Sequence, residues 1–300
     1  MRCIYLFILV LAVGCSSSDK KTNDLASVPQ PTPGQSFKKE PALKLSEVKD
    51  FYVQGIATNS PALMDETIDR YSAEELAQLS GDSDPLLGIS IYCSKGDFDR
   101  AFSLAAKNYD RYYKVPQYWN QIANCHLGQG SERKALLFYN KALETSPEYI
   151  PALNNIGVLY SRSNQDQKAL VAFERAYKQS KFAKTPRYNL AKLYLSYGLA
   201  ELALPLFTGL SEGFPNDIDL LNGVASSHYL MSNYQKAWSY YQKIPQDHWK
   251  SPEIGLSLAV TLARLNKKPY ALKVFENVSS PKSEALRDYY NSVQKNLGAN

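Results

Sequence analysis

Single alanines recur along this chain at a fixed spacing of 34 residues, and this repetition constrains the fold more than any other feature. They are Ala101, Ala135, Ala169, Ala203, Ala237 and Ala271. Four residues after each alanine the position is bulky or apolar, and twelve residues before it the position is mostly small. A fixed period of this length indicates a solenoid, because one unit cannot bury its apolar face alone and therefore stacks on its neighbours.

Each interval has room for two helices of about three turns, joined by a short turn such as Lys95-Gly96-Asp97. Small residues at equivalent points let neighbouring helices approach closely, and large residues fill the spaces between them. The hydrophobic content of 44% is enough for a continuous core. The sequence therefore predicts an all-α chain.

The pattern resembles the tetratricopeptide repeat (TPR). The interval 116–149 has the fullest match: Trp119, Ile122, Ala123, Gly130, Ala135, Tyr139, Ala142 and Pro147. Gly88 departs from the pattern at a position that should be large. The resemblance implies a right-handed α-α superhelix over residues 82–285, with six units at 82–115, 116–149, 150–183, 184–217, 218–251 and 252–285.

Both ends of the predicted stack need helices with a polar outer face. Residues 42–81 are interpreted as a divergent helical cap at the N-terminal end, although Thr67 stands where the repeated alanine should be. Residues 286–300 are interpreted as a C-terminal capping helix, whose apolar side includes Leu286, Tyr289 and Val293.

Residues 1–14 have the pattern of a signal peptide, with Arg2 followed by an apolar run from Ile4 to Val13. Cys15 follows this run directly, and the junction resembles the bacterial lipobox, which implies lipidation of Cys15. The alternative is an ordinary secretory signal with an incidental cysteine. Ser16 after the cysteine implies the outer membrane by the sorting rule of enteric bacteria.

Residues 15–41 are polar and contain Pro29, Pro31 and Pro33. Such a segment cannot bury enough apolar surface to offset ordering, so a disordered tether is expected. As a flexible coil, this segment would have a root-mean-square end-to-end distance of about 28 Å. The solenoid is therefore expected to stand off the membrane.

Cys93 and Cys125 fall in the first helices of adjacent units. Their positions in the repeat differ by two, which predicts different faces and two buried free thiols. An oxidising envelope nevertheless permits a disulfide.

Few patterns in the chain suggest chemistry. Gly209 to Gly213 match the G-x-S-x-G motif of hydrolases, but the glycines are better explained as helix-stop residues. His126 and His228 share one repeat position three units apart, so they cannot share a metal and each replaces a core tyrosine. We therefore expect that the chain is not an enzyme and that it binds no metal or cofactor. Its net charge of +5, without a basic cluster, does not favour binding to nucleic acid.

The TPR resemblance implies that the first helix of each unit lines a concave groove. Carried over by position, the partner-binding residues are Asn120, Asn124, Asn154, Tyr188, Lys192, Asn222, Tyr229 and Arg264. A side-chain amide can donate to a peptide carbonyl and accept from a peptide N–H, so a row of asparagines fits an extended backbone, with the two tyrosines as flat anchors. The alternative is that these asparagines are only solubilising.

The functional hypothesis is a lipid-anchored scaffold on the outer membrane, facing the periplasm and binding a protein or extended peptide. In layout it resembles the TPR lipoproteins that assemble type IV pili, including pilotin-type proteins, and those that gather envelope enzymes. The alternatives are a hydrolase using Ser211 and a structural envelope lipoprotein.

Overall fold

A computed structural model describes residues 84–298 of the chain, without the side chain of Ala285. The expected signal peptide with its cleavage at Cys15, the tether and the N-terminal cap lie outside the described residues.

Within 84–298 the chain consists of helices and short connections, with no strand, so the all-α prediction is confirmed. The first helices of the successive pairs are α3 (Pro85–Ser94), α6 (Pro116–Gly128), α8 (Ile150–Arg162), α10 (Lys184–Ser196), α12 (Ile218–Leu230) and α14 (Pro252–Arg264). The second helices are α4 (Phe98–Lys107), α7 (Glu132–Thr145), α9 (Asp166–Gln179), α11 (Ala200–Ser211), α13 (Tyr234–Tyr241) and α15 (Lys268–Glu276). A short helix α5 (Tyr109–Tyr112), a 3₁₀ turn η2 (Gln246–Lys250) and the terminal helix α16 (Glu284–Leu297) complete the described chain.

The turn inside each pair repeats one backbone conformation at the 34-residue spacing. The residue with positive φ is Gly96, Gly130, Asn164, Gly198, Ser232 or Asn266. The following N–H donates back to a carbonyl of the preceding helix, as from Ser131 to His126 at 2.8 Å. Glycine adopts this left-handed conformation without strain, which explains its use in three of the six turns.

The alanine ladder is a packing seam. All six repeated alanines are fully buried. Similar close contact occurs at Gly157, where an added Cβ would lie 2.5 Å from the ring of Phe173. The 34-residue period therefore marks the points where helices approach most closely.

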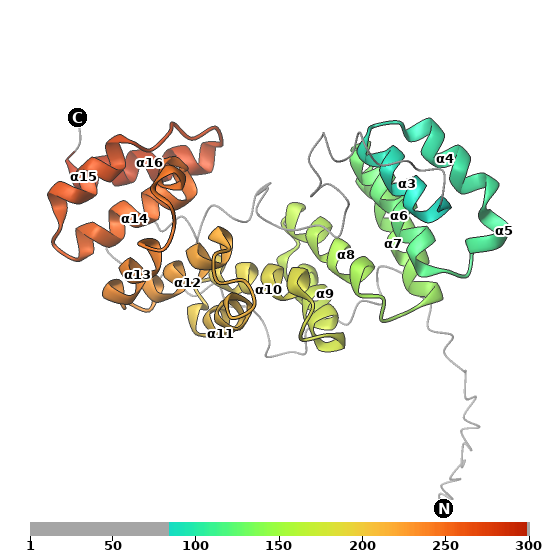
Figure 1. The fold of residues 1–300 in the computed structure, drawn as a ribbon, viewed down its shortest axis with the longest axis horizontal. Helices are drawn as coiled ribbons and strands as arrows, with labels where there is room; N and C mark the ends of the chain where they lie inside the picture. Colours follow the sequence, from blue (N-terminus) through green and yellow to red (C-terminus); the bar gives the residue numbers. More distant parts are fainter. Residues whose placement is uncertain (1–83, 299–300) are drawn as a thin grey trace, which may run out of the picture.

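The helix pairs form an open arc (Figure 1). Consecutive first helices contact each other on its inner side, as α8 does with α10, α10 with α12 and α12 with α14. The second helices lie on the outer side, and each from α4 to α13 packs against the first helix of its own pair and of the next. None of the described helices is long and apolar enough to cross a membrane.

Helix α16 closes the C-terminal end of the arc by packing on α14 and α15. Ser283 caps its N-terminus, because the Ser283 hydroxyl accepts from the Leu286 N–H at 3.4 Å, and Gly298 follows its last turn with a φ of 67°. Its own residues Val293 and Leu297 are buried. Its apolar side therefore covers the core of the last helix pair.

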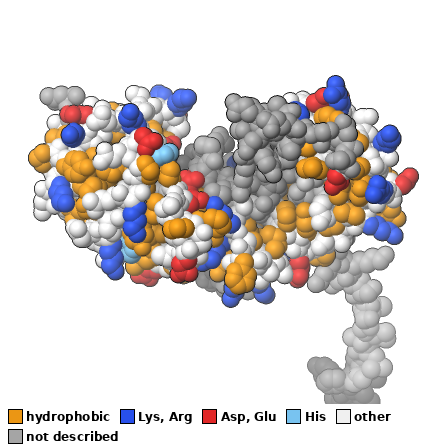
Figure 2. All heavy atoms as spheres, viewed as in Figure 1, with side chains coloured by type: hydrophobic (Ala, Val, Ile, Leu, Met, Phe, Trp, Pro, Cys, Tyr) orange, Lys and Arg blue, Asp and Glu red, His pale blue; other side chains and the backbone are white. Residues whose placement is uncertain are grey.

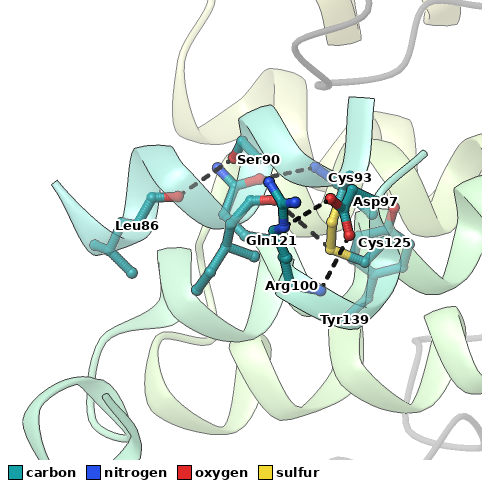
Figure 3. The surroundings of a disulfide bond; sticks show 10 residues. Leu86, Ser90, Cys93, Asp97, Arg100, Gln121, Cys125 and Tyr139 are labelled. Atoms are coloured by element: carbon teal, nitrogen blue, oxygen red, sulfur yellow. Dashed lines mark hydrogen bonds and ion pairs between the residues drawn. A yellow bond between two sulfur atoms is a disulfide. The ribbon is translucent and has the colours of Figure 1, made fainter. Parts of the chain in front are cut away.

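The expectation of two free thiols is wrong, because Cys93 of α3 and Cys125 of α6 form a disulfide (Figure 3). Their Cα atoms are 5.0 Å apart, within the range that a disulfide can bridge. The argument from repeat position failed because α3 and α6 pack directly and are offset along their axes, so facing residues do not occupy identical positions. The bond fixes the first two helix pairs to each other.

Candidate functional site

The eight predicted groove residues all lie on first helices. Asn120 and Asn124 are on α6, Asn154 is on α8, and Tyr188 and Lys192 are on α10. Asn222 and Tyr229 are on α12, and Arg264 is the last residue of α14. The first helices therefore carry the whole set, spread over five consecutive units.

A chain of side-chain amides crosses three of these helices. Asn155 Nδ2 donates to Asn124 Oδ1 at 3.2 Å, and Asn154 Nδ2 donates to Asn155 Oδ1 at 3.1 Å. Asn189 Nδ2 then donates to Asn154 Oδ1 at 2.9 Å. We call Asn124, Asn155, Asn154 and Asn189 the amide ladder. The ladder ties α6, α8 and α10 together and holds the amides of Asn124 and Asn154 in fixed orientations.

Asn155 and Asn189 were not among the predicted site residues. Both are fully buried, and each occupies the same position in its unit. Two asparagines at one buried repeat position were the available signal, because a buried amide needs partners and a neighbouring unit can supply them. The alternative that the groove asparagines are only solubilising is contradicted at Asn120 and Asn154, because both side chains are buried.

Asn120 differs from the ladder residues. Its side chain is 2% exposed, and its Oδ1 has no hydrogen-bond partner among residues 84–298. A buried acceptor without a donor costs about 1–3 kcal/mol. A donor from a bound molecule would remove this cost once the Asn120 side chain turns to bring its buried carbonyl oxygen within reach.

The two tyrosines were predicted as flat anchors in the groove, and both are buried. Tyr188 is 2% exposed and meets Phe207 edge to face at a centroid distance of 5.8 Å. Tyr229 is 5% exposed and lies 5.5 Å from the Tyr234 ring. Each ring therefore contributes to packing between helices, and a binding role for either stays a prediction.

Lys192 is the charged centre of the inner face. Its side chain is buried, and burial lowers the pKa of its ammonium from 10.5 to about 8, against the attraction of Asp219 and Glu253. The two acids come from α12 and α14, so the cluster joins three consecutive first helices. Asn222 nearby accepts from the Ser226 hydroxyl at 3.5 Å. This part of the inner face is polar and charged, unlike the amide-rich part at α6 and α8.

Ser211 lacks the surroundings of a hydrolase nucleophile. It is the last residue of α11, and its hydroxyl donates to the Phe207 carbonyl at 2.9 Å. A nucleophile elbow needs a strand that leads into a helix, and residues 84–298 contain no strand. The hydrolase alternative therefore loses its structural context.

The histidines pack as rings, as expected. His126 stacks on Phe138 at 5.1 Å and meets Phe102 at 4.7 Å. His228 meets Tyr240 at 5.7 Å. Burial lowers the pKa of both imidazoles, which favours their neutral form in these aromatic surroundings.

Comparison with known proteins supports the repeat assignment. The family model described as tetratricopeptide repeat matches residues 116–149. Anaphase-promoting complex subunit 3 of Schizosaccharomyces pombe is 24% identical over 165 residues, covering 55% of this chain and 25% of that protein. Tetratricopeptide repeat protein 8 of Caenorhabditis elegans is 24% identical over 185 residues, covering 60% of this chain and 35% of that protein. The chain thus spans only a quarter to a third of these curated relatives.

Solved structures show the same fold. YrrB, described as a TPR protein with an unusual peptide-binding site, is 18% identical, with a TM-score of 0.53 over 65% of this chain and 97% of that chain. The Cut9–Hcn1 hetero-tetramer of the anaphase-promoting complex contains a chain that is 16% identical, with a TM-score of 0.55 over 77% of this chain and 45% of that chain. The predicted TPR solenoid is confirmed, and this architecture is suited to binding other proteins.

Proposed function

We propose that the chain is a lipid-anchored envelope scaffold that holds an extended protein segment against the inner face of its solenoid. The observation that carries the binding part is Asn120, a buried acceptor without a partner in residues 84–298, beside the amide ladder. An extended backbone presents N–H groups at regular spacing, and one of them can donate to Asn120 Oδ1. The partner class is therefore a peptide-like segment.

Two features support a location outside the cytoplasm. The sequence places Cys15 directly after the apolar run of a signal peptide. Independently, the Cys93–Cys125 disulfide is of the kind that persists in oxidising compartments. We propose the bacterial outer membrane as the site of anchoring, with the solenoid in the periplasm. The layout of anchor, tether and repeat scaffold suits the assembly of type IV pili or of other envelope machines.

The binding part is tested with Asn120→Ala. Partner capture from envelope extract should fall by about two- to ten-fold, since one hydrogen bond contributes about 0.5–1.5 kcal/mol. The melting temperature should stay unchanged or rise, because the lost acceptor has no partner within the described residues. This combination separates a binding role from a structural one.

A matched control is Asn140→Ala on the outer helix α7. Asn140 is also buried, and its amide donates to the Leu136 carbonyl at 2.9 Å. Its loss should lower stability and leave partner capture intact in the folded protein. Equal capture by the wild type and Asn120→Ala would remove Asn120 from the binding surface.

The anchoring part is tested with Cys15→Ser. The lipid attaches through the thiol, so the variant should accumulate as an uncleaved precursor or leave the outer-membrane fraction. Cys93 and Cys125 serve as internal controls, because serine there should not change fractionation. A mature, membrane-bound Cys15→Ser protein would contradict the anchor.

A further inference from the structure

Exposed aromatic residues occur in one kind of place in the described chain. Tyr109, Tyr113, Phe182 and Phe214 are the exposed aromatics among residues 84–298, and each lies in a connection between one helix pair and the next. Exposed leucines such as Leu137 and Leu202 lie instead on second helices, α7 and α11. Exposed apolar residues that are scattered singly over a surface need no explanation. Exposed aromatic residues that occur only in equivalent connections do need one.

These connections share one edge of the solenoid. All first helices run in the same direction through the stack, so the connections that lead into them lie along a single edge, which winds with the arc. We call the segments 109–114, 181–184 and 213–216 the aromatic edge.

Cations accompany the rings of the aromatic edge. Lys114 Nζ lies 5.3 Å from the Tyr113 ring centroid, and Lys184 Nζ lies 4.3 Å from the Phe214 centroid. Lys184 also pairs with Asp217 at 2.7 Å, which ties the two neighbouring connections together. Lys181, next to Phe182, is exposed. The edge therefore presents aromatic rings together with long basic side chains.

Phe182 is more exposed than any other large apolar side chain among residues 84–298. It is 94% exposed, next to Phe214 at 47% on the adjacent connection. A ring that stands clear of its own protein has no pocket to define a specific protein partner. It is, however, shaped to enter a soft interface, where rings settle at headgroup level and lysines extend to the phosphates.

The overall charge favours the same partner. Residues 84–298 contain 26 Lys and Arg against 18 Asp and Glu, a formal charge of +8, whereas residues 1–83 contain 8 against 11, a charge of −3. Those two segments together give the +5 of the whole chain. The solenoid, whose Lys and Arg side chains on one face are blue in Figure 2, is thus the basic part of the protein, and an anionic surface attracts it.

We propose that the aromatic edge is a peripheral membrane-binding surface that docks the solenoid on anionic lipid headgroups. Phe182 inserts at the interface, Phe214 and Lys184 support it, and Lys181 contacts lipid phosphate. The inner face of the arc stays available to a partner, because the edge and the inner face are different sides of each helix pair. This inference is independent of the groove and adds an orientation to the proposed anchor.

The test uses the chain from residue 16 onward, which lacks the signal peptide and the lipid site. The core described above lies within residues 89–297, so this chain keeps all of it. Co-sedimentation is measured with vesicles of phosphatidylcholine alone and with vesicles that also contain phosphatidylglycerol. We expect binding to the anionic vesicles, weaker binding to the neutral ones, and loss of binding as salt is raised.

Variants locate the surface. Lys181→Ala should lower vesicle affinity about five-fold, which corresponds to about 1 kcal/mol per basic residue at an anionic surface. Phe182→Ala should lower it roughly ten-fold, because an apolar ring leaves the interface. Leu137→Ala is the matched control: this residue is 64% exposed on the outer face of α7 and should change nothing. Circular dichroism should be the same for all three.

Three outcomes would overturn the proposal. They are an absence of binding to anionic vesicles, equal binding by wild type and Phe182→Ala, and an equal loss in Leu137→Ala. If Phe182→Ala lost a protein partner and kept its vesicle binding, the edge would be a protein interface instead. A failed vesicle assay leaves the Cys15→Ser fractionation and the Asn120→Ala capture results unaffected, so the proposals can fail separately.

Discussion

Cys93, in the last turn of α3, is joined by a disulfide to Cys125 in the last turn of α6, with their Cα atoms 5.0 Å apart. The bond links neighbouring helix pairs across 32 residues of sequence. In a solenoid each unit depends on its neighbours, and the end units have only one. The disulfide therefore reinforces the described stack at its N-terminal end.

Replacing both cysteines with serine should destabilise the protein by about 3–4 kcal/mol, since closing a loop of this length constrains the unfolded chain by that amount. Urea unfolding, followed by circular dichroism with and without reductant, measures the effect. Reductant should lower the midpoint of the wild type and leave the double-serine variant unchanged. If the urea midpoint of the wild type stayed the same after complete reduction of the disulfide, this contribution to stability would be contradicted.

Ala169→Leu should destabilise the stack by about 1–3 kcal/mol, because three added carbon atoms have no space in a fully buried seam. The loss should appear as a lower midpoint in thermal or urea unfolding. Ala106→Leu is the control, since Ala106 is exposed on α4 and leucine fits there. Similar midpoints for both variants would mean that the repeated alanine is not a packing seam.

Gly157→Ala should also destabilise, although alanine is the better helix former by about 1 kcal/mol. The added methyl group would lie 2.5 Å from the Phe173 ring, which is itself fully buried and cannot move freely. Gly213→Ala, whose nearest neighbour would be the Leu210 carbonyl oxygen at 3.7 Å, should be nearly neutral. A gain of stability in Gly157→Ala would show that the Phe173 ring can move aside with little loss of packing energy.

The fold was predictable because its cause is local and repeated. A small residue every 34 positions marks the close contacts, and Gly96, Gly130 and Gly198 mark turns that need positive φ. The candidate site was less predictable, because repeat position gives the helix face and not the depth of a side chain. The burial of Tyr188 and the hydrogen bond between the side chains of Asn154 and Asn189 depend on how neighbouring units tilt against each other. The disulfide was missed for the same reason, since the offset of α3 against α6 is a property of the packed pair.

The buried ammonium of Lys192 gives a pH-dependent prediction. Its folded pKa of about 8 is below the unfolded value of 10.5, so the unfolded chain binds more protons between these values. Below pH 8 the lysine is charged in both the folded and the unfolded state, so the full free-energy cost of burying its ammonium lowers the stability of the fold. As pH rises from 8 to 10.5 this unfavourable contribution disappears, and above 10.5 it is absent.

Lys192→Met keeps the volume and removes the charge, so it should be more stable than the wild type near neutral pH. The advantage should shrink by up to roughly 3 kcal/mol as pH rises through this window, since each pKa unit corresponds to about 1.4 kcal/mol. Urea unfolding of both proteins at several pH values measures the difference, in which all other titrating groups cancel to first order. Lys178→Met, at an exposed position on the outer face of α9, should match the wild type throughout. A stability difference for Lys192→Met that stays constant with pH would contradict the lowered pKa and place the Lys192 ammonium in contact with water.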